Sequence, residues 1–239
     1  MSELLPNLKL SLDEPETSLT DHAARRLGVR PDDIVALRVR RRSLDARRGR
    51  PIAWVYTVEV VFAGETPPAT DRPAPPQVAP ERLRGLVPPV IVGAGPAGLF
   101  AALTLTDHGV PCVLLERGAA IPARHRAVHA LRHAGVLDPE SNICFGEGGA
   151  CTYSDGKLMT RKRGVEVQRV FERLVEFGAV PDILVDAQPH VGTNRLGRIV
   201  VALRTALAER GATVRFGARV DDLVVRAGRV CGVRLAGGE

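Results

Sequence analysis

The chain has 239 residues, of which 45% are hydrophobic and 25% are charged, a composition that allows a sizeable core and excludes wholesale disorder. The net charge of +6 comes almost wholly from arginine, because lysine occurs only at Lys9, Lys157 and Lys162. A basic balance favours anionic partners in general, but it carries no information about the fold.

The cysteines show neither a CxxC pair nor the spacing of zinc ligands. They are Cys112, Cys144, Cys151 and Cys231. Glu3 and Pro6 interrupt any apolar run at the N-terminus, so we expect no secretion signal, no metal and a reducing, cytoplasmic setting. Gly85–Thr106 lacks charge and is long enough to cross a bilayer. Its prolines and glycines favour a strand, a turn and a helix instead, and we expect no membrane span.

Residues 1–63 are predicted to form a small α+β domain of ferredoxin-like character. Its expected elements are a strand at Leu5–Leu12, a helix at Ser18–Leu27, and strands at Ile34–Arg41 and Ile52–Phe62. Ser18 and Asp21 have the spacing of a helix capping box.

Residues 64–89 hold eight of the chain's 18 prolines, lack apolar periodicity and are interpreted as a stiff linker. Residues 90–239 then alternate strand and helix, which predicts a Rossmann-like α/β domain. Its strands are expected at Val90–Val92, Cys112–Glu116, Thr213–Phe216, Leu223–Arg226 and Val230–Leu235, and its helices at Ala97–His108, Glu166–Glu176 and Arg195–Arg210.

Gly93, Gly95 and Gly98 form a GxGxxG motif directly after the first of these strands and at the start of an apolar helix. The first glycine allows a tight turn, the second lets the backbone approach a pyrophosphate, and the third lets the helix pack closely on the sheet. The helix N-terminus offers free N–H groups to an anion. The flanking strand and helix make the motif specific for a dinucleotide, against the alternative of a glycine turn without a ligand.

Glu116 ends the next strand, 23 residues after Gly93. A carboxylate there accepts hydrogen bonds from a ribose diol and repels the 2′-phosphate of NADP. FAD and NAD both remain open on these grounds.

GAGPAGL, together with the acidic strand end in LLERG, resembles the FAD site of the glutathione-reductase-like flavoproteins. The resemblance implies FAD as the cofactor. The residues it implies at the cofactor are Gly93, Ala94, Gly95, Pro96, Ala97, Gly98, Glu116 and Arg117.

A second stretch, Leu137–Leu158 (LDPESNICFGEGGACTYSDGKL), is similar to a segment of an uncharacterised family of bacterial FAD-dependent dehydrogenases, as are Arg40–Arg47 and Pro189–Leu196. The resemblance covers nearly the whole chain. It implies that the FGEGGA loop lies near the flavin, and that a strand backbone near Val220 meets the adenine. The loop residues concerned are Gly146, Glu147, Gly148 and Gly149.

Several polar groups near this loop have two interpretations. Cys144 and Cys151 depart from the family pattern, as does Asn194, and we favour small buried thiols over a redox pair. Ser154, Asp155 and Lys157 either touch the flavin or form a solvated turn. A lone loop histidine such as His190 is usually structural, so no catalytic residue is assigned.

Arginine is densest between Arg38 and Arg50, with seven residues at positions 38, 40, 41, 42, 47, 48 and 50. A nucleic-acid surface is one interpretation. We favour a solvated strand face, because no aromatic residues are interleaved for base stacking.

The sequence thus predicts an FAD-binding oxidoreductase with an unknown small-molecule substrate or electron partner. The superfamily's later strand with an ATG-like turn is not found, so we expect the chain to be the N-terminal part of a longer flavoprotein, inactive on its own. The alternatives are an NAD-binding module, an RNA-associated flavoprotein acting on tRNA, and a non-catalytic remnant.

Overall fold

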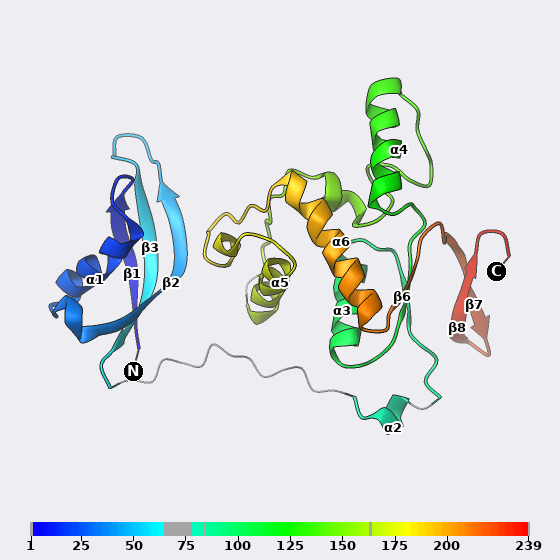
Figure 1. Cartoon of the computed structure of the whole chain (residues 1–239), viewed down its shortest axis with the longest axis horizontal. Helices are drawn as coiled ribbons and strands as arrows, with labels where there is room; N and C mark the ends of the chain where they lie inside the picture. Colours follow the sequence, from blue (N-terminus) through cyan, green and yellow to red (C-terminus); the bar gives the residue numbers. More distant parts are fainter. Residues whose placement is uncertain (1, 65–77, 84, 163, 239) are drawn as a thin grey trace. The chain divides into compact units, whose positions relative to one another are not determined.

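The computed structural model describes residues 2–64, 78–83, 85–162 and 164–238. The chain divides into two units, which we describe separately (Figure 1). The first comprises residues 1–73, 158–163 and 180–190, and the second comprises residues 74–157, 164–179 and 191–239. Two segments predicted to belong to the second domain therefore belong to the first unit.

The first unit contains one antiparallel sheet with the strand order β1-β3-β2. Its elements are β1 (Glu3–Ser11), η1 (Glu16–Ser18), α1 (Leu19–Leu27), η2 (Pro31–Asp33), β2 (Ile34–Asp45), β3 (Ala53–Phe62) and the short 3₁₀ helix η4 (Pro181–Leu184). The middle strand β3 separates β1 from β2, which gives the split βαβ arrangement. No second long helix and no fourth strand are found in the described part of this unit, so the ferredoxin-like assignment stays a prediction.

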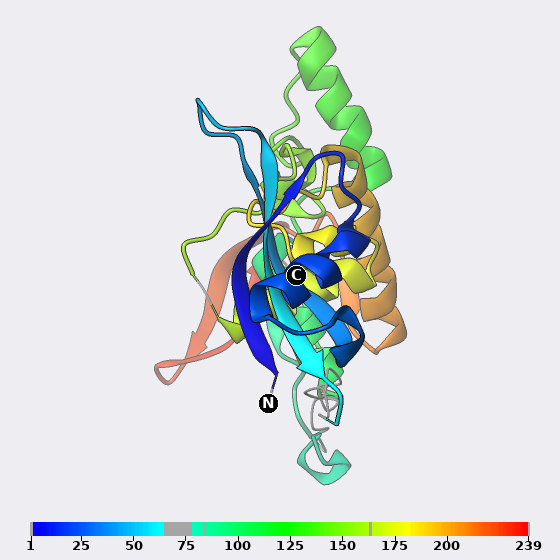
Figure 2. The same ribbon diagram turned by 90° about the vertical axis from the view of Figure 1, so that its left-hand side faces the viewer.

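One face of this sheet is covered by α1 (Figure 2). The buried residues of the core are Leu5, Leu8, Leu10, Leu19, Ala23, Tyr56, Val58 and Val60. Leu5 and Leu8 are three residues apart, which strict alternation would place on opposite faces. Asn7 adopts a left-handed conformation with φ 58° at a break in the register of β1. This bulge turns both leucines toward the core.

The capping box predicted at the start of α1 is wrong. Ser18 is the N-cap residue, but its side chain makes no capping hydrogen bond. The 3₁₀ turn η1 precedes the helix, so Ser18 has helical dihedrals (φ −68°, ψ −11°) instead of the extended ones that aim a capping hydroxyl at the first turn.

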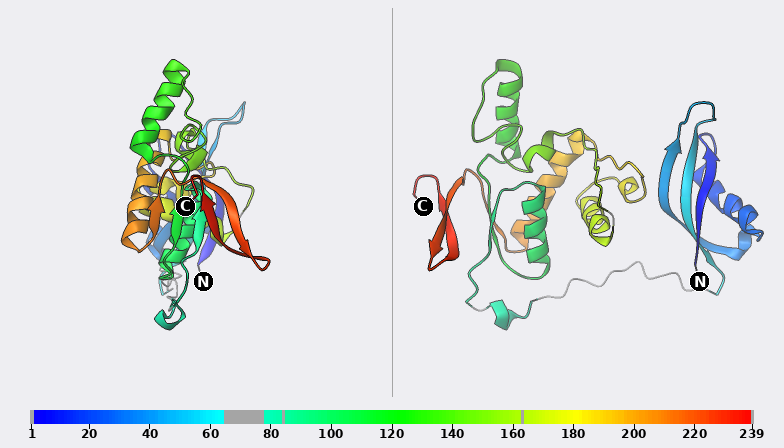
Figure 3. Two further views of the ribbon diagram at one scale, coloured as in Figure 1. Left: turned by 90° about the vertical axis from the view of Figure 1, so that its right-hand side faces the viewer. Right: turned by 180° about the vertical axis from the view of Figure 1, so that it is seen from behind.

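The second unit contains a parallel sheet with the order β4-β5-β6, which supports the mixed α/β prediction. The strands of the whole unit are β4 (Val90–Val92), β5 (Val113–Leu115), β6 (Thr213–Arg215), β7 (Val220–Arg226) and β8 (Arg229–Leu235). Its helices are α2 (Pro80–Leu83), α3 (Pro96–Asp107), α4 (Ile121–Ala134), η3 (Gly149–Tyr153), α5 (Val165–Glu176) and α6 (Thr193–Glu209). The strands β7 and β8 form an antiparallel hairpin of their own (Figure 3).

Two short segments differ from the expectations. The segment interpreted as a stiff linker contains the single helical turn α2, which was not predicted; residues 65–77 of it lie outside the described part of the chain. The helix α4 was missed, although Pro122 near its start and Gly135 after its end, with φ 67°, are standard boundary signals.

Gly85–Thr106, the uncharged stretch, forms a turn, β4, the glycine loop and α3. None of the described helices combines the length and apolar composition that crossing a membrane requires.

Candidate FAD site

The glycine loop between β4 and α3 has the geometry that its three glycines predict. Gly93 turns the chain with φ 98°, and its N–H donates to Leu115 O at 2.7 Å. A Cβ added at Gly98 would lie 1.9 Å from the carbonyl oxygen of Gly93. Only glycine at position 98 therefore lets α3 start this close to the strand.

The N-terminus of α3 is available to an anion. The helix begins at Pro96 after an N-cap glycine, Gly95, so no side chain caps it, and its first turn contains no acidic residue. Pro96 and Ala97 are both exposed. The first turn therefore presents the positive end of the helix dipole at an exposed surface, and no acidic side chain or cap neutralises it. Such a helix end suits a pyrophosphate.

Glu116 connects three backbone segments at the carboxyl ends of the strands. Its Oε2 accepts a hydrogen bond from Ala94 N at 2.8 Å, and its Oε1 accepts from Gly118 N at 2.8 Å and from Gly146 N at 2.9 Å. The side chain is buried, with 5% of the residue exposed. A carboxylate offers about four lone-pair positions, so one position on Oε2 remains for a further donor.

The structure brings the FGEGGA loop against the glycine loop. Gly148 N donates to Ala94 O at 2.8 Å. A Cβ at Gly149 would lie 3.1 Å from the Cα of Gly95, and Gly146, Gly148 and Gly149 all have positive φ. The predicted cofactor residues 93–98, 116 and 146–149 therefore form one cluster, although they come from three separate stretches.

Arg124 organises this loop, a role that the sequence pattern did not predict. Its residue is 0% exposed, and its guanidinium donates to the carbonyl oxygens of Asn142, Ile143 and Glu147. The same group lies 4.8 Å from the ring centroid of Tyr153. A Cβ at Gly146 would lie 2.4 Å from the Cδ of Arg124, which explains why the loop has glycine there. The sequence of α4 is largely polar, so nothing in it indicates that one of its arginines is buried. Only the fold shows this.

The side chain of Glu147 is buried beneath the FGEGGA loop and is not exposed at its surface. Its Oε2 accepts from Ile121 N at 2.7 Å, and its Oε1 lies 2.8 Å from Arg204 Nε in an ion pair without hydrogen-bond geometry. Burial raises the pKa of this carboxyl, while the Ile121 N–H and the charges of Arg204 and Arg124 oppose the rise. Glu147 thus supports the loop from inside, and its carboxylate contacts α4 and α6.

Arg117 and Val220 lie at the edge of the cluster. Arg117 pairs with Glu140 at 3.0 Å, and its guanidinium lies 4.2 Å from the ring centroid of Phe145. Val220 packs on a small apolar cluster that includes Leu115. The structure brings neither side chain to the glycine loop, and a role for the backbone of Val220 at an adenine stays a prediction.

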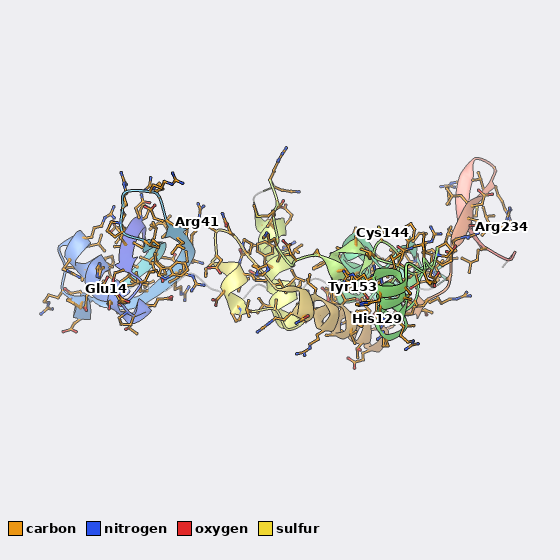
Figure 4. All side chains as sticks on the ribbon, turned by 90° about the horizontal axis from the view of Figure 1, so that it is seen from above. Glu14, Arg41, His129, Cys144, Tyr153 and Arg234 are labelled. Atoms are coloured by element: carbon orange, nitrogen blue, oxygen red, sulfur yellow. The ribbon has the colours of Figure 1, made fainter. Side chains whose placement is uncertain are left out.

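Cys151 has the features of a structural cysteine, whereas the prediction of a buried thiol is wrong for Cys144. Cys144, which Figure 4 labels, is exposed, Cys151 is partly buried, and both are free. The Cys151 Sγ donates to Gly148 O at 3.0 Å, and burial raises the pKa of this thiol. A raised pKa disfavours the reactive thiolate.

The polar residues after the loop form a turn. Lys157 Nζ pairs with Asp155 at 2.9 Å, and both side chains are more than 60% exposed. The hydroxyl of Ser154 donates to Cys151 O at 2.8 Å. His190 is exposed and belongs to the first unit, whereas the turn belongs to the second.

Part of the arginine cluster on β2 is paired with carboxylates. Arg42 pairs with Asp182 at 2.7 Å and with Asp186 at 2.8 Å. Arg40 pairs with Glu59, while Arg41 is exposed (Figure 4). The backbone of Arg42 also bonds to residues 185 and 187, which attaches this segment to the sheet edge. These pairs favour a structural role over a nucleic-acid surface.

Comparison with known proteins assigns the cofactor. Residues 2–61 match a domain of unknown function (DUF8436), and residues 87–139 match an FAD binding domain. The second match spans the glycine loop, Glu116 and Arg117. The cofactor of this unit is FAD.

The curated relatives are longer than this chain. An uncharacterized protein of Clostridium beijerinckii is 32% identical over 241 residues, which covers 96% of this chain and 45% of that protein. The thiamine thiazole synthase of Methanococcus vannielii is 25% identical over 144 residues, 60% of this chain and 44% of the enzyme. The chain thus spans less than half the length of the curated relatives it matches.

Solved structures show more distant likeness. The THI4 protein of Thermovibrio ammonificans has a TM-score of 0.41 and 21% identity, covering 65% of this chain and 50% of that one. The 3-ketosteroid-delta4-(5alpha)-dehydrogenase of Rhodococcus jostii has a TM-score of 0.36 and 16% identity, covering 63% and 42%. The FAD assignment rests on the match over residues 87–139 and not on these likenesses.

Proposed function

We propose that this chain is the cofactor-binding part of an FAD-dependent oxidoreductase, with the flavin held between the glycine loop and the FGEGGA loop. The observation that carries the proposal is the joining of these loops by Glu116 and by the hydrogen bond from Gly148 N to Ala94 O. The bonded residues Ala94 and Gly148 are 54 positions apart in the sequence. No side chain fills the space over Gly95, because an added Cβ there would have only the Gly149 Cα nearby, at 4.0 Å.

The residues present fit FAD. The uncapped N-terminus of α3 would hold the pyrophosphate, because backbone N–H groups and the helix dipole both favour an anion there. The remaining lone-pair position on Glu116 Oε2 would accept a ribose hydroxyl. The glycines at 146, 148 and 149 would allow the backbone to approach the ligand closely.

FAD, when bound, supplies the acceptance and release of a hydride or of electrons. The chain's own residues bind and orient it. Arg124 and Glu147 would keep the FGEGGA loop in place from below, and the Glu116 carboxylate would keep the two loops in register. The reaction on the substrate is left to the whole protein, because this chain spans less than half the length of its curated relatives.

The test is to purify the chain and measure bound flavin by visible absorbance and mass spectrometry, and then to titrate the flavin-free chain with FAD and, separately, with NADH. We expect one FAD per chain and no comparable affinity for NADH. A folded, colourless chain that takes up no added FAD would refute the proposal, and preferential binding of NADH would support the NAD-binding alternative instead.

A further inference from the structure

A cavity of about 540 Å³ lies between α4 and α6, with η3 as its floor. It is lined by Ile121, His125, Arg132, Thr152, Tyr153, Asn194, Gly197, Arg198 and Val201. Its volume is within the range of about 300 to 1,000 Å³ that is usual for small-molecule sites. None of the glycine-loop residues 93–98 lines it, so it is separate from the expected position of the pyrophosphate.

The charges around this cavity are of one sign. Arg132 and Arg198 line it, and no acidic residue does. Within the described residues, neither arginine forms a salt bridge, whereas Arg117, Arg204 and Arg219 of the same unit are all paired with carboxylates. Two arginines without counter-charges on the same cavity favour an anionic ligand.

The other polar groups suit the same ligand. His125 Nδ1 and the hydroxyl of Tyr153, which Figure 4 labels, lie 2.7 Å apart and form a hydrogen bond. Asn194 is in the first turn of α6, which contains no acidic residue and has no side-chain cap. The dipole of this 17-residue helix therefore adds to the positive potential that the arginines create.

The cavity also has an apolar wall. Ile121 of α4 and Val201 of α6 both line it, and Tyr153 adds an aromatic ring to this lining. An inorganic ion would leave that wall uncovered. A ligand with an acidic group and an apolar body would satisfy both parts of the lining.

We propose that the cavity between α4 and α6 binds the carboxylate or phosphate group of a small organic molecule, with Arg132 and Arg198 as the recognising side chains. The two arginines and the apolar wall would bind such an acid with or without FAD. If FAD binds as proposed above, however, the cavity lies near it, because Thr152 and Tyr153 of its lining belong to the same 3₁₀ helix, η3, as Gly149 of the FGEGGA loop. That position suits an acidic substrate of the flavin.

The experiment is calorimetric titration of the full chain at low ionic strength with three probes: benzoate, phenyl phosphate and benzamide. Benzamide has the shape of benzoate without its charge. We expect benzoate or phenyl phosphate to bind at least about tenfold more tightly than benzamide, the effect of one charge-assisted hydrogen bond. Comparing the two acids shows which group the site prefers.

Variants locate the binding. Arg198→Gln and Arg132→Gln are each expected to weaken acid binding about tenfold, and Arg126→Gln, an exposed arginine of α4 outside the cavity, is the matched control. Gly197→Leu fills the cavity and should abolish binding. A Cβ at Gly197 has only Ile121 Cδ1 nearby, at 3.9 Å, so this variant should fold.

Equal binding of benzoate, phenyl phosphate and benzamide, or acid binding that survives both Arg198→Gln and Gly197→Leu, would overturn the proposal. Displacement of benzoate by FAD would also overturn it, because the cavity would then belong to the FAD site. FAD uptake is measured on the same samples. A chain that takes up FAD but no acid contradicts only this inference, and one that binds the acid but no FAD contradicts only the proposed function.

Discussion

In the sheet of the first unit, the positions that face α1 are apolar, and Val58 and Val60 in the middle strand are completely buried. At the carboxyl edge of the parallel sheet, by contrast, the buried side chains include Glu116, Arg124 and Glu147. The apolar core can be rebuilt from many combinations of similar volume. The polar cluster depends on individual hydrogen bonds between side chains and glycine-rich backbone, and a partly satisfied network is costly.

The two regions should therefore respond differently to substitution. The single tryptophan, Trp54, lies on β3 and reports on the first unit, whereas bound flavin reports on the second. Two independent signals can thus follow the two regions in one sample.

Gly98→Ala should have the largest effect. The added Cβ would meet the Gly93 carbonyl at 1.9 Å, so the turn must open, at a cost of about 3 kcal/mol, and FAD affinity should fall at least about 100-fold. Gly197→Ala, in the second turn of α6, is the control, and it should stabilise the chain by up to about 1 kcal/mol. Retained FAD binding in Gly98→Ala would show that this glycine is not needed at the site.

Arg124→Met should destabilise the second unit by about 3 kcal/mol, because it leaves buried carbonyl groups without donors. FAD uptake should be lost, while the Trp54 unfolding transition stays unchanged. Arg126→Met, the same substitution on an exposed face of α4, controls for the loss of charge. Normal FAD affinity in Arg124→Met would mean that the loop does not need this support.

Val58→Ala tests the apolar core. Removing two methyl groups from a completely buried position should cost about 2 kcal/mol, which urea unfolding followed by Trp54 fluorescence would measure. FAD uptake should persist. Loss of bound flavin together with an unchanged Trp54 unfolding transition would contradict the separation of the two regions.

Glu147→Gln should change the pH dependence of stability. Burial raises the pKa of Glu147 above its ordinary 4.5, so the folded chain holds this proton more tightly than the unfolded chain does. Its contribution to stability is full below 4.5 and is lost as the pH rises through the raised pKa. Wild type should therefore lose stability relative to Glu147→Gln over that window in urea titrations from about pH 4 to about pH 8. A constant difference between the two proteins would contradict the raised pKa.

Lys157→Ala should have the smallest effect. Its ion pair with Asp155 is exposed, so stability should change by less than about 1 kcal/mol. FAD affinity should change by less than about twofold. A tenfold loss of affinity, measured by flavin titration, would restore the alternative that Lys157 contacts the cofactor.

Local patterns predicted much of the second unit. The glycine spacing at 93, 95 and 98 and the acidic end of the next strand follow from short-range backbone geometry, and the helical periods of α5 and α6 are equally local. The same kind of local pattern failed at Ser18, where an unexpected 3₁₀ turn changed the dihedrals of the cap residue.

By itself, the sequence determined that a dinucleotide loop follows β4 and that a carboxylate lies at the end of β5. Only the tertiary structure decided that Arg124 is buried, that Gly148 bonds to Ala94, and that segment 180–190 attaches to the first unit through Arg42. These contacts join residues tens of positions apart. Periodicity and glycine spacing carry no information on which distant groups meet, because that depends on the packing of the whole fold.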